Sequence, residues 1–187
     1  MNKEELKEAV RILRSGGVIL YPTDTIWGLG CDATNQEAVD RLRAVKGREE
    51  GKAMLVLVAE DGMLQRYVKD VPKVAWDLID CADKPTTIIY PEGIHFAEGV
   101  TAEDGSIGIR KTDDETCVFM IKGLNKPLVS TSANFAGQPS PSVFREISEE
   151  LKNKVDYIVP FRQDEQGGRA SAVIKLGLGG QISILRK

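Results

Sequence analysis

The sequence predicts an α/β protein with a mixed sheet. Short apolar runs of strand length alternate with amphipathic segments along most of the chain, a pattern typical of sheets flanked by helices. The last three strand candidates follow one another with little helix between them, which favours some antiparallel neighbours. With 187 residues, of which 42% are hydrophobic, the chain is long enough to bury one core. We therefore expect a single domain over residues 1–187.

The first elements have clear sequence signals. Residues 3–14 predict a helix, because acidic side chains occupy its first turn and apolar residues recur at helical spacing. Two glycines end this helix, and residues 18–21 predict an apolar strand that a proline terminates. Thr34 and Glu37 have the spacing of a capping box, so a second helix is expected from there to about Ala44.

The rest of the chain continues the alternation. Further apolar runs predict strands over residues 53–58, 86–90, 106–110, 128–130, 157–159, 172–176 and 182–185. Helical patterns lie over residues 72–80 and 143–151. The weakly patterned stretch 91–105 is interpreted as a mobile loop able to cover a site.

The charge balance and the cysteines disfavour several kinds of protein and of binding site. The balance of 25 Lys plus Arg against 28 Asp plus Glu gives a net charge of -3, which argues against bulk nucleic-acid binding but allows a local basic pocket. Cys31, Cys81 and Cys117 are odd in number and scattered, which favours reduced thiols over a disulfide framework or a zinc site. No apolar run approaches the ~18 residues of a membrane span. We expect a cytoplasmic protein without membrane contact.

Hydroxyl and amide side chains gather in residues 130–134, Ser-Thr-Ser-Ala-Asn. They follow the apolar run 127–129, and the end of a strand is where α/β sheets place their ligands. The alternative is an ordinary strand-to-turn junction, because serine and asparagine are common turn residues.

A cationic segment comes earlier in the chain, where Lys46, Arg48 and Lys52 surround Gly47 and Gly51. A guanidinium forks onto two phosphate oxygens, lysines act as point charges, and glycines allow close backbone approach. The alternative is a solvated turn, since cations are favoured at a helix C-terminus without any ligand. Together, the two segments suggest a nucleotide site.

Standard catalytic motifs are absent. The sequence has neither a Walker motif nor a complete Gly-x-Gly-x-x-Gly. His95 is the one histidine, so we favour a solvated loop residue over a catalytic relay or a metal ligand. Arg110 ends a predicted strand as either a surface cation or a carboxylate clamp, and Arg186 is by default part of a solvated tail. No metal site built from protein side chains is expected.

Five segments, taken together, carry a family resemblance. They are residues 21–30 (YPTDTIWGLG), Lys46-Gly47-Arg48 with Lys52, residues 108–110 (GIR), residues 130–134 with 137–139 (GQP), and residues 171–173 (SAV). Lys-x-Arg paired with Ser-x-Asn at this separation is more specific than either half. Through these segments, which span nearly the whole chain, the protein resembles the YrdC-like family of threonylcarbamoyl-AMP synthases.

The resemblance implies an open, twisted mixed sheet with flanking helices around a positively lined cavity. It also implies a nucleotidyltransferase that makes L-threonylcarbamoyladenylate and pyrophosphate from L-threonine, bicarbonate and ATP, with Mg²⁺ travelling with the nucleotide. The product is then passed to a threonylcarbamoyl transferase complex that forms threonylcarbamoyladenosine in tRNA.

The family resemblance also implies roles for individual residues, according to their positions in the matching segments. Lys46 and Arg48 belong to the catalytic cationic element. The implied nucleotide positions are Arg48, Lys52, Ser106, Ser130, Ser132, Asn134, Ser140 and Arg186. The implied threonine positions are Thr25, Arg110 and Ser171, and a guanidinium suits the threonine carboxylate. No protein nucleophile is needed, and the proton acceptor is left open between Asp24 and the substrate's own oxygens.

The chain departs from the family pattern at several places. Residues 84–87 stand where relatives carry Pro-Gly-Pro-x-Thr, and residues 113–115 replace Pro-x-His-Pro. Leu57 occupies a position where some relatives place a histidine, and Ala172 replaces a commoner threonine. We expect the backbone around the threonine pocket to differ and the histidine contact to be lost or replaced.

Two other functions remain open. A non-catalytic paralogue of this fold would contact tRNA or double-stranded RNA, although the net charge of -3 and the intact 130–134 motif count against it. A carbamoyl-transferring domain of a larger hydrogenase-maturation protein is disfavoured by the lack of zinc-finger cysteines.

Overall fold

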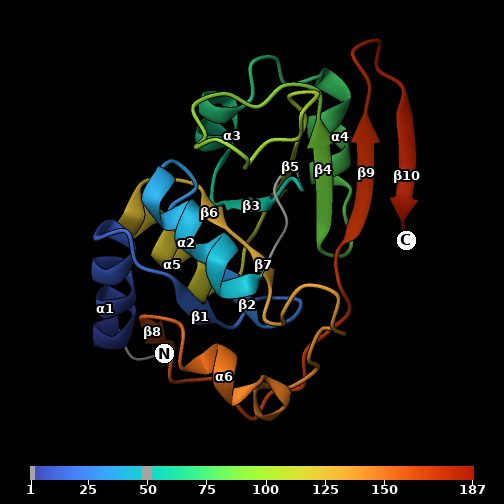
Figure 1. Cartoon of the computed structure of the whole chain (residues 1–187). Helices are drawn as coiled ribbons and strands as arrows, with labels where there is room; N and C mark the ends of the chain where they lie inside the picture. Colours follow the sequence, from blue (N-terminus) through green and yellow to red (C-terminus); the bar gives the residue numbers. More distant parts are fainter. Residues whose placement is uncertain (1–2, 48–51) are drawn as a thin grey trace.

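Two open β-sheets form the framework in a computed structural model that describes residues 3–47 and 52–187 (Figure 1). The smaller sheet has the strand order β7-β2-β1-β8, and the larger has the order β10-β9-β4-β5-β3-β6. In the larger sheet β3 runs parallel to β5, whereas β4 runs antiparallel to β5 and parallel to β9. The prediction of an open mixed sheet with flanking helices is confirmed.

The bounds of the elements are as follows. The strands are β1 (Ile19–Tyr21), β2 (Gly28–Gly30), β3 (Leu55–Val58), β4 (Thr86–Tyr90), β5 (Ile107–Lys111), β6 (Leu128–Val129), β7 (Thr131–Ser132), β8 (Tyr157–Ile158), β9 (Ala172–Leu176) and β10 (Ile182–Arg186). The helices are α1 (Lys3–Arg14), α2 (Gln36–Lys46), α3 (Asp61–Tyr67), α4 (Lys73–Asp80), α5 (Glu115–Leu124) and α6 (Glu149–Lys152).

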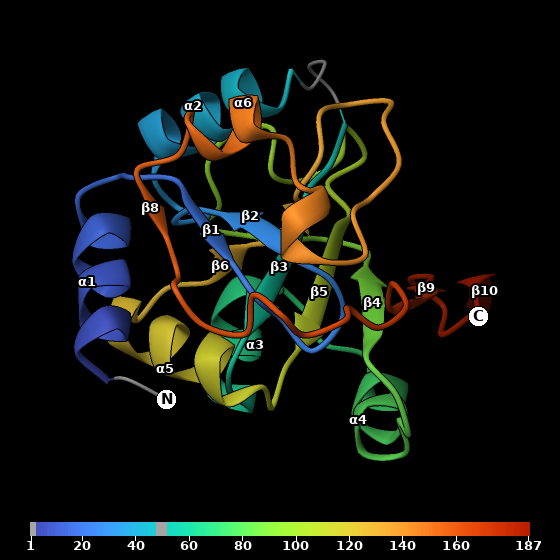
Figure 2. The ribbon, with the colours of Figure 1, turned by 90° about the horizontal axis from the view of Figure 1, so that it is seen from below.

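Helices lie on one face of the larger sheet and the smaller sheet lies on the other. Figure 2 shows α3 and α4 on one side of the larger sheet, strands β1 and β2 followed by α2 on the other, and the β9–β10 hairpin at the far edge. The core is continuous, from α1 through β1 and β3 to α5. No helix among the described residues has the length and apolar character needed to cross a membrane.

The chain passes from the larger sheet to the smaller one at Ser130. Strand β6 pairs with β3, and β7 pairs with β2. Ser130 lies between β6 and β7, and its backbone N–H donates to the Leu55 carbonyl at 2.8 Å. The polar motif 130–134 therefore starts at the junction of the two sheets.

Several predicted elements are confirmed. Helix α1 has the predicted bounds and buries its apolar face, and strands β4 and β9 match residues 86–90 and 172–176. In these segments the apolar residues recur with a clear period, and turn residues flank them. Together, these two local signals are enough to locate a helix or strand.

Two predictions were wrong. Residues 143–151 do not form one helix: Phe144–Glu146 is a 3₁₀ turn, and Ile147, with ψ 128°, is extended before α6 begins. Ile147 is buried, so its anchoring in the core breaks the helix. Thr34 does not cap α2, because its hydroxyl donates to Asp32 at 2.7 Å while the Asn35 side chain accepts the Ala38 N–H.

Four elements were not predicted, namely α3, α5, β2 and β7. Helix α5 is capped by Asp114, which accepts the Cys117 N–H at 3.0 Å, and ends at Asn125 with φ 58°. Its aromatic and β-branched residues mask the helical period. Strand β2 is Gly-Leu-Gly, and a Cβ at Gly30 would lie 2.7 Å from Tyr21, so the glycine permits the close pairing with β1.

A further glycine governs the packing of α1 on α5, which lie side by side in Figures 1 and 2. A Cβ at Gly123 would lie 2.8 Å from Val10 Cγ2. Gly123→Ala is therefore expected to lower the free energy of unfolding by about 1–3 kcal/mol, because the added methyl overpacks this contact. Urea denaturation measures the change.

Gly62→Ala is the matched control, because it also adds a methyl to a helix but meets no atom within 4 Å. It is expected to leave stability unchanged or slightly raised. Equal loss of stability in both variants would contradict the close-packing argument.

Candidate functional site

A cleft of about 340 Å³ opens where the two sheets meet. It is walled by the β1–β2 loop, β3, β5, the 130–132 segment and the chain around β9 and β10. Seven of the residues predicted from sequence line it: Thr25, Arg110, Ser130, Ser132, Ser140, Ser171 and Arg186. The structure thus gathers the three threonine positions and four of the nucleotide positions in one cavity.

Lys46 holds the hydroxyl-bearing turn in place. It ends α2, is 3% exposed, and its ammonium donates to the carbonyl oxygens of Ser132 and, at 3.0 Å, of Asn134. Its Nζ also lies 3.3 Å from the Ser132 hydroxyl. The predicted meeting of the cationic segment with the 130–134 motif is therefore present, and Lys46 fixes the turn from behind the cleft.

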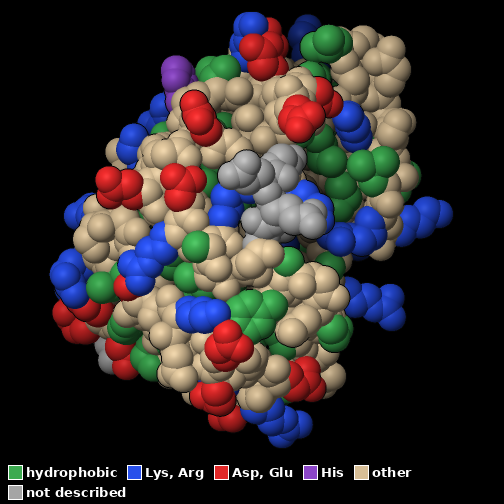
Figure 3. Space-filling model, in the orientation of Figure 1, with side chains coloured by type: hydrophobic (Ala, Val, Ile, Leu, Met, Phe, Trp, Pro, Cys, Tyr) green, Lys and Arg blue, Asp and Glu red, His purple; other side chains and the backbone are tan. Residues whose placement is uncertain are grey.

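The other cations of that segment are placed differently. Lys52 is exposed and does not line the cleft, although the adjacent Ala53 does. Arg48 lies outside the described residues. On the face shown in Figure 3, Lys and Arg side chains are interspersed with Asp and Glu side chains rather than gathered into one continuous patch.

Arg110 is the buried charge of the cleft. The residue is 3% exposed on β5, and its Nη1 donates to the Thr25 hydroxyl at 3.1 Å. Its Nη2 pairs with Asp24 Oδ1 at 3.0 Å. A guanidinium held at two corners keeps a fixed orientation, so the side chain is preorganised rather than a mobile surface cation.

Three buried polar side-chain atoms lack a hydrogen-bond partner within the described part of the chain. They are Arg110 Nε, Thr131 Oγ1 and Asn134 Oδ1. All three lie at the cleft or in the turn beside it. Buried polar groups are normally satisfied, and unsatisfied ones mark places where another molecule or water completes the structure.

Burial and neighbouring charges shift the pKa of Asp24 in opposite directions. Burial raises the pKa of its carboxyl and Asp114 adds to that rise, whereas the Arg110 guanidinium lowers it. Asp24 pairs with Arg110 and so anchors that side chain. It is also one of the two candidate proton acceptors that the sequence analysis left open.

The loop that carries Thr25 is braced from two sides. Thr23 Oγ1 lies 2.9 Å from Thr25 Oγ1 and accepts the Thr25 backbone N–H at 3.0 Å. Arg162, held at φ 60°, donates to the Thr23 carbonyl at 3.0 Å and pairs with Asp114 at 2.7 Å. A non-glycine residue with positive φ is strained, and such strain is common beside functional sites.

Ser171 and Arg186 form the opposite wall. The Ser171 hydroxyl lies 2.8 Å from that of Thr87 on β4. Arg186 Nε donates to the Ser171 carbonyl at 2.7 Å, and its Nη2 reaches the Ser171 hydroxyl at 3.5 Å. Arg186 is thus tied to the cleft wall rather than being a free solvated tail.

Besides Lys52, two more predicted nucleotide positions, Ser106 and Asn134, do not line this cleft. Ser106 is buried just before β5, where its N–H donates to Asp104 at 3.0 Å. It is on the same face of the strand as Arg110 but four residues away. The Asn134 amide donates to the carbonyls of Phe135 and Gln138, at 3.0 and 2.7 Å, which supports its role in shaping the turn.

Trp27 and Thr131 are among the lining residues that sequence reasoning did not single out. Trp27 is 3% exposed and packs against Phe144 in a tilted arrangement, with ring centroids 4.8 Å apart. Both residues sit inside motifs that were recognised, so the signal was present but the side chains were not singled out. Leu57 pairs in register with Arg110 and is fully buried, so no side chain there replaces the histidine of some relatives at the cleft.

The 91–105 stretch packs away from this cleft. Its Ala97 N–H donates to the Ala33 carbonyl at 3.0 Å, and the Val100 carbonyl accepts the Met54 N–H at 2.9 Å. None of its residues lines the cleft, so it does not cover the site in this structure. Over residues 3–47 and 52–187, no group of three or more His, Cys, Asp and Glu side chains is arranged to hold a metal ion.

Comparison with known proteins agrees with this site. Residues 11–187 match the family model for Sua5, YciO and YrdC, described as telomere recombination. A threonylcarbamoyl-AMP synthase of Pseudomonas aeruginosa is 38% identical over 152 residues, which is 81% of this chain and 82% of the relative. One from Pseudoalteromonas translucida is 31% identical over 186 residues, 97% of each chain.

Sua5 and YciO proteins are among the solved structures of similar fold. P. abyssi Sua5 in complex with L-threonine superposes with a TM-score of 0.83 at 25% identity, covering 94% of this chain and 52% of that one. The chain therefore spans about half the length of that Sua5. E. coli YciO superposes with a TM-score of 0.82 at 25% identity, covering 100% of this chain and 90% of that one. This chain belongs to the Sua5/YciO/YrdC family.

Proposed function

We propose that this protein is an L-threonylcarbamoyl-AMP synthase, a nucleotidyltransferase that forms threonylcarbamoyl-AMP and pyrophosphate from L-threonine, bicarbonate and ATP. The observation that carries the proposal is the buried Arg110 in a hydroxyl-lined cleft, whose Nη1 donates to Thr25 and whose Nε has no partner among the described residues. The names of the relatives and the L-threonine complex of P. abyssi Sua5 support the same activity.

Threonine is proposed to bind at the Arg110 end of the cleft. A carboxylate accepts bidentate hydrogen bonds from a guanidinium, and the hydroxyls of Thr25 and Ser171 suit the amine and hydroxyl of the amino acid. Asp24 already compensates one side of Arg110, so an incoming carboxylate meets a side chain that is held in place.

ATP is proposed to occupy the hydroxyl-lined side of the cleft. Ser130, Ser132 and Ser140 offer donors to phosphate oxygens, and Arg186 adds a guanidinium. Arg48 and Lys52 are assigned to the triphosphate on the sequence resemblance. Mg²⁺ is assigned to the nucleotide substrate on the sequence resemblance, where it would offset the charge of the phosphates.

The chemistry needs no protein nucleophile. The threonine nitrogen bonds to the carbon of bicarbonate, whose C–OH bond breaks so that the hydroxyl leaves as water with a proton from the nitrogen. Alternatively, bicarbonate first loses its hydroxyl to give carbon dioxide, to which the nitrogen adds with loss of a proton. Either route gives a carbamate. A carbamate oxygen then bonds to the α-phosphorus, the bond to the bridging oxygen of the β-phosphate breaks, and pyrophosphate leaves. Holding the reactants in line contributes up to ~7–11 kcal/mol, and the cations of the site stabilise the developing charge.

The product would pass to a threonylcarbamoyl transferase complex for tRNA modification in the cytoplasm. Direct contact with tRNA or double-stranded RNA belongs to the alternative, non-catalytic role. The test incubates the protein with ATP, bicarbonate and Mg²⁺, with and without L-threonine, and measures pyrophosphate and the adenylate. Threonine-dependent formation of both is expected. RNA binding without threonine-dependent turnover would replace this function with the alternative.

Arg48→Ala is expected to abolish threonine-dependent pyrophosphate release, because it removes a phosphate donor of the assigned catalytic element. The assay above measures the loss, and circular dichroism checks that the fold is retained. Glu103→Gln, which removes an exposed charge that does not line the cleft, is the control and should keep full activity. A fully active Arg48→Ala protein would refute the assignment.

A further inference from the structure

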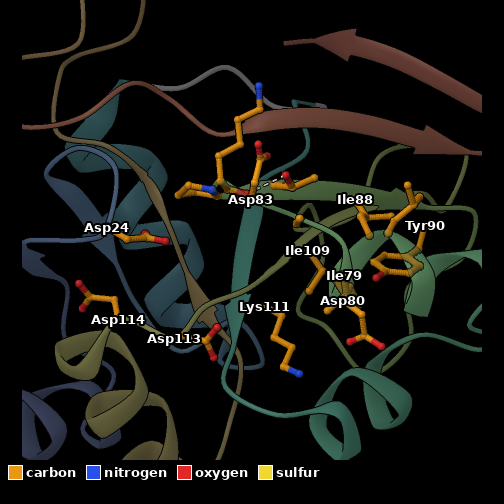
Figure 4. Close-up of a pocket in the computed structure, with 15 residues that line it drawn as sticks. Asp24, Ile79, Asp80, Asp83, Ile88, Tyr90, Ile109, Lys111, Asp113 and Asp114 are labelled. Carbon is orange, nitrogen blue, oxygen red and sulfur yellow. Dashed lines mark hydrogen bonds between the residues drawn. The ribbon is translucent and has the colours of Figure 1, made fainter.

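A second cleft, of about 500 Å³, lies between α4 and the larger sheet (Figure 4). Ile109 and Lys111 line it, whereas Arg110 lines the substrate cleft. Successive residues of a strand point to opposite faces, so the two clefts lie on opposite sides of β5. The second cleft is therefore a separate cavity, and we refer to it as the acidic cleft.

Aspartates dominate the walls of this cleft. Asp24, Asp80, Asp83, Asp113 and Asp114 line it, against the two cations Lys84 and Lys111. Figure 4 shows these carboxylates distributed around the cavity rather than on one side.

Part of this negative charge has no direct partner among the described residues, and Lys111 acts on Asp80 and Asp113 only at longer range. Within the described part of the chain, Asp80, Asp83 and Asp113 form neither a hydrogen bond through their carboxylates nor an ion pair. Lys111 is already paired with Asp61 at 2.7 Å. The cleft therefore attracts a cation.

The cavity also has an apolar side. Leu78 comes from α4, and Ile88 and Ile109 are each 2% exposed on adjacent strands. A bare or hydrated metal ion gains nothing from such a surface, and the described residues hold no group arranged as metal ligands. An alkyl chain does gain from it, because its contact surface leaves water.

Tyr90 supplies an independent sign of a ligand. It is 1% exposed and lines the cleft, yet its hydroxyl has no hydrogen-bond partner among the described residues. Figure 4 shows the hydroxyl turned toward the region where Ile79 and Lys111 lie, not toward the bulk of the molecule. Burial raises the pKa of this phenol, so it stays neutral and able to accept a hydrogen bond. The hydroxyl is not one of the fully enclosed unsatisfied atoms, so it faces the cavity, where a ligand N–H can donate to it.

We propose that the acidic cleft binds a small organic cation, an alkyl chain that ends in an ammonium or guanidinium group. The charged end pairs with the aspartates, the stem lies on Leu78, Ile88 and Ile109, and an N–H of the ligand donates to Tyr90. The volume falls in the range of small-molecule sites, roughly 300–1,000 Å³. This site is independent of the proposed synthase activity, although Asp24 lines the acidic cleft and also pairs with Arg110.

Isothermal titration of the full chain with agmatine, without ATP or threonine, tests the site. One saturable binding event is expected. Tyr90→Phe should weaken it about tenfold by removing one hydrogen bond to a charged group. The double variant Asp83→Asn with Asp113→Asn should weaken it at least about tenfold and reduce its salt dependence. Glu103→Gln, an exposed acid outside the cleft, should bind agmatine as the unaltered protein does.

A second arm identifies the source of the cation. Nα-acetyl-lysine amide carries the ammonium on a peptide-like stem, so tighter binding than agmatine assigns the site to a side chain presented by a protein. Tighter binding of agmatine assigns it to a free amine. No saturable heat with either ligand, or equal affinity in Tyr90→Phe and the unaltered protein, overturns the proposal. Because neither titration contains substrate, these outcomes do not depend on synthase activity.

Discussion

Arg110→Lys is expected to raise the KM for L-threonine by roughly 10- to 100-fold while the KM for ATP stays near its original value. Lysine keeps a positive charge beside Asp24 but loses the planar fork that a carboxylate needs. A hydrogen bond to a charged group is worth about 1.5–3 kcal/mol, which sets this range. Initial rates of pyrophosphate release at varied threonine and varied ATP separate the two constants.

Arg11→Gln is the matched control for this variant, because it removes an exposed arginine on α1 that pairs only with the nearby Glu8. Its KM values should be unchanged. If Arg110→Lys raised the KM for ATP as much as that for threonine, the assignment of Arg110 to the amino acid would be wrong.

Lys46→Met is expected to lower the free energy of unfolding by about 2–4 kcal/mol and to abolish synthase activity. Methionine is of similar length, so the main loss is the ammonium that satisfies the Ser132 and Asn134 carbonyls. Each buried group left without its partner costs about 1–3 kcal/mol. Urea denaturation measures the stability, and the pyrophosphate assay, run well below the unfolding transition, measures the activity.

Two further variants test whether Lys46 acts by holding the turn or by contacting the nucleotide. Lys122→Met, at an exposed position on α5, should change neither stability nor activity. Ser132→Ala keeps both carbonyl bonds to Lys46 and should be nearly as stable as the original protein. Lost activity at full stability in Lys46→Met would show that its ammonium acts on the substrate rather than on the turn.

The parts of the fold that the sequence predicts are those set by local pattern. Helix α1 has a full amphipathic period, and β4 and β9 are dense in β-branched residues, so each was located closely. Helix α5 was missed because its capping by Asp114 and Asn125 is visible only in the backbone geometry. The extended Ile147 splits residues 143–151 for a tertiary reason, namely its burial in the core.

The candidate site was predicted through the family resemblance and then assembled by topology. Thr25, Arg110 and Ser171 are far apart in sequence, and nothing local indicates that they share a cleft. The role of Lys46 could be recognised only from the structure. In sequence, a buried cation that binds carbonyls looks the same as a solvated cation at a helix end. The functional roles of the individual residues stay predictions until the variants above are measured.

The acidic cleft was beyond sequence reasoning for the same reason. Its walls come from a helix end, two strands and three loops. Residues 84–87 and 113–115, where this chain departs from the family pattern, contribute Lys84, Thr86 and Asp113 to it. The expected change of backbone at the threonine pocket stays a prediction, and these departures line the face of the sheet opposite Arg110.

Residues 128–132 belong to both sheets, and this gives substrate binding a mechanical consequence. The covalent link at Ser130 joins the sheets at one end of the cleft, and the contacts of Arg110, on the larger sheet, with Thr25 and Asp24, beside the smaller one, join them at the other. A threonine bound at Arg110 as proposed would reinforce this second connection. Binding then works as a removable crosslink that stiffens the hinge between the sheets and slows amide exchange in both together.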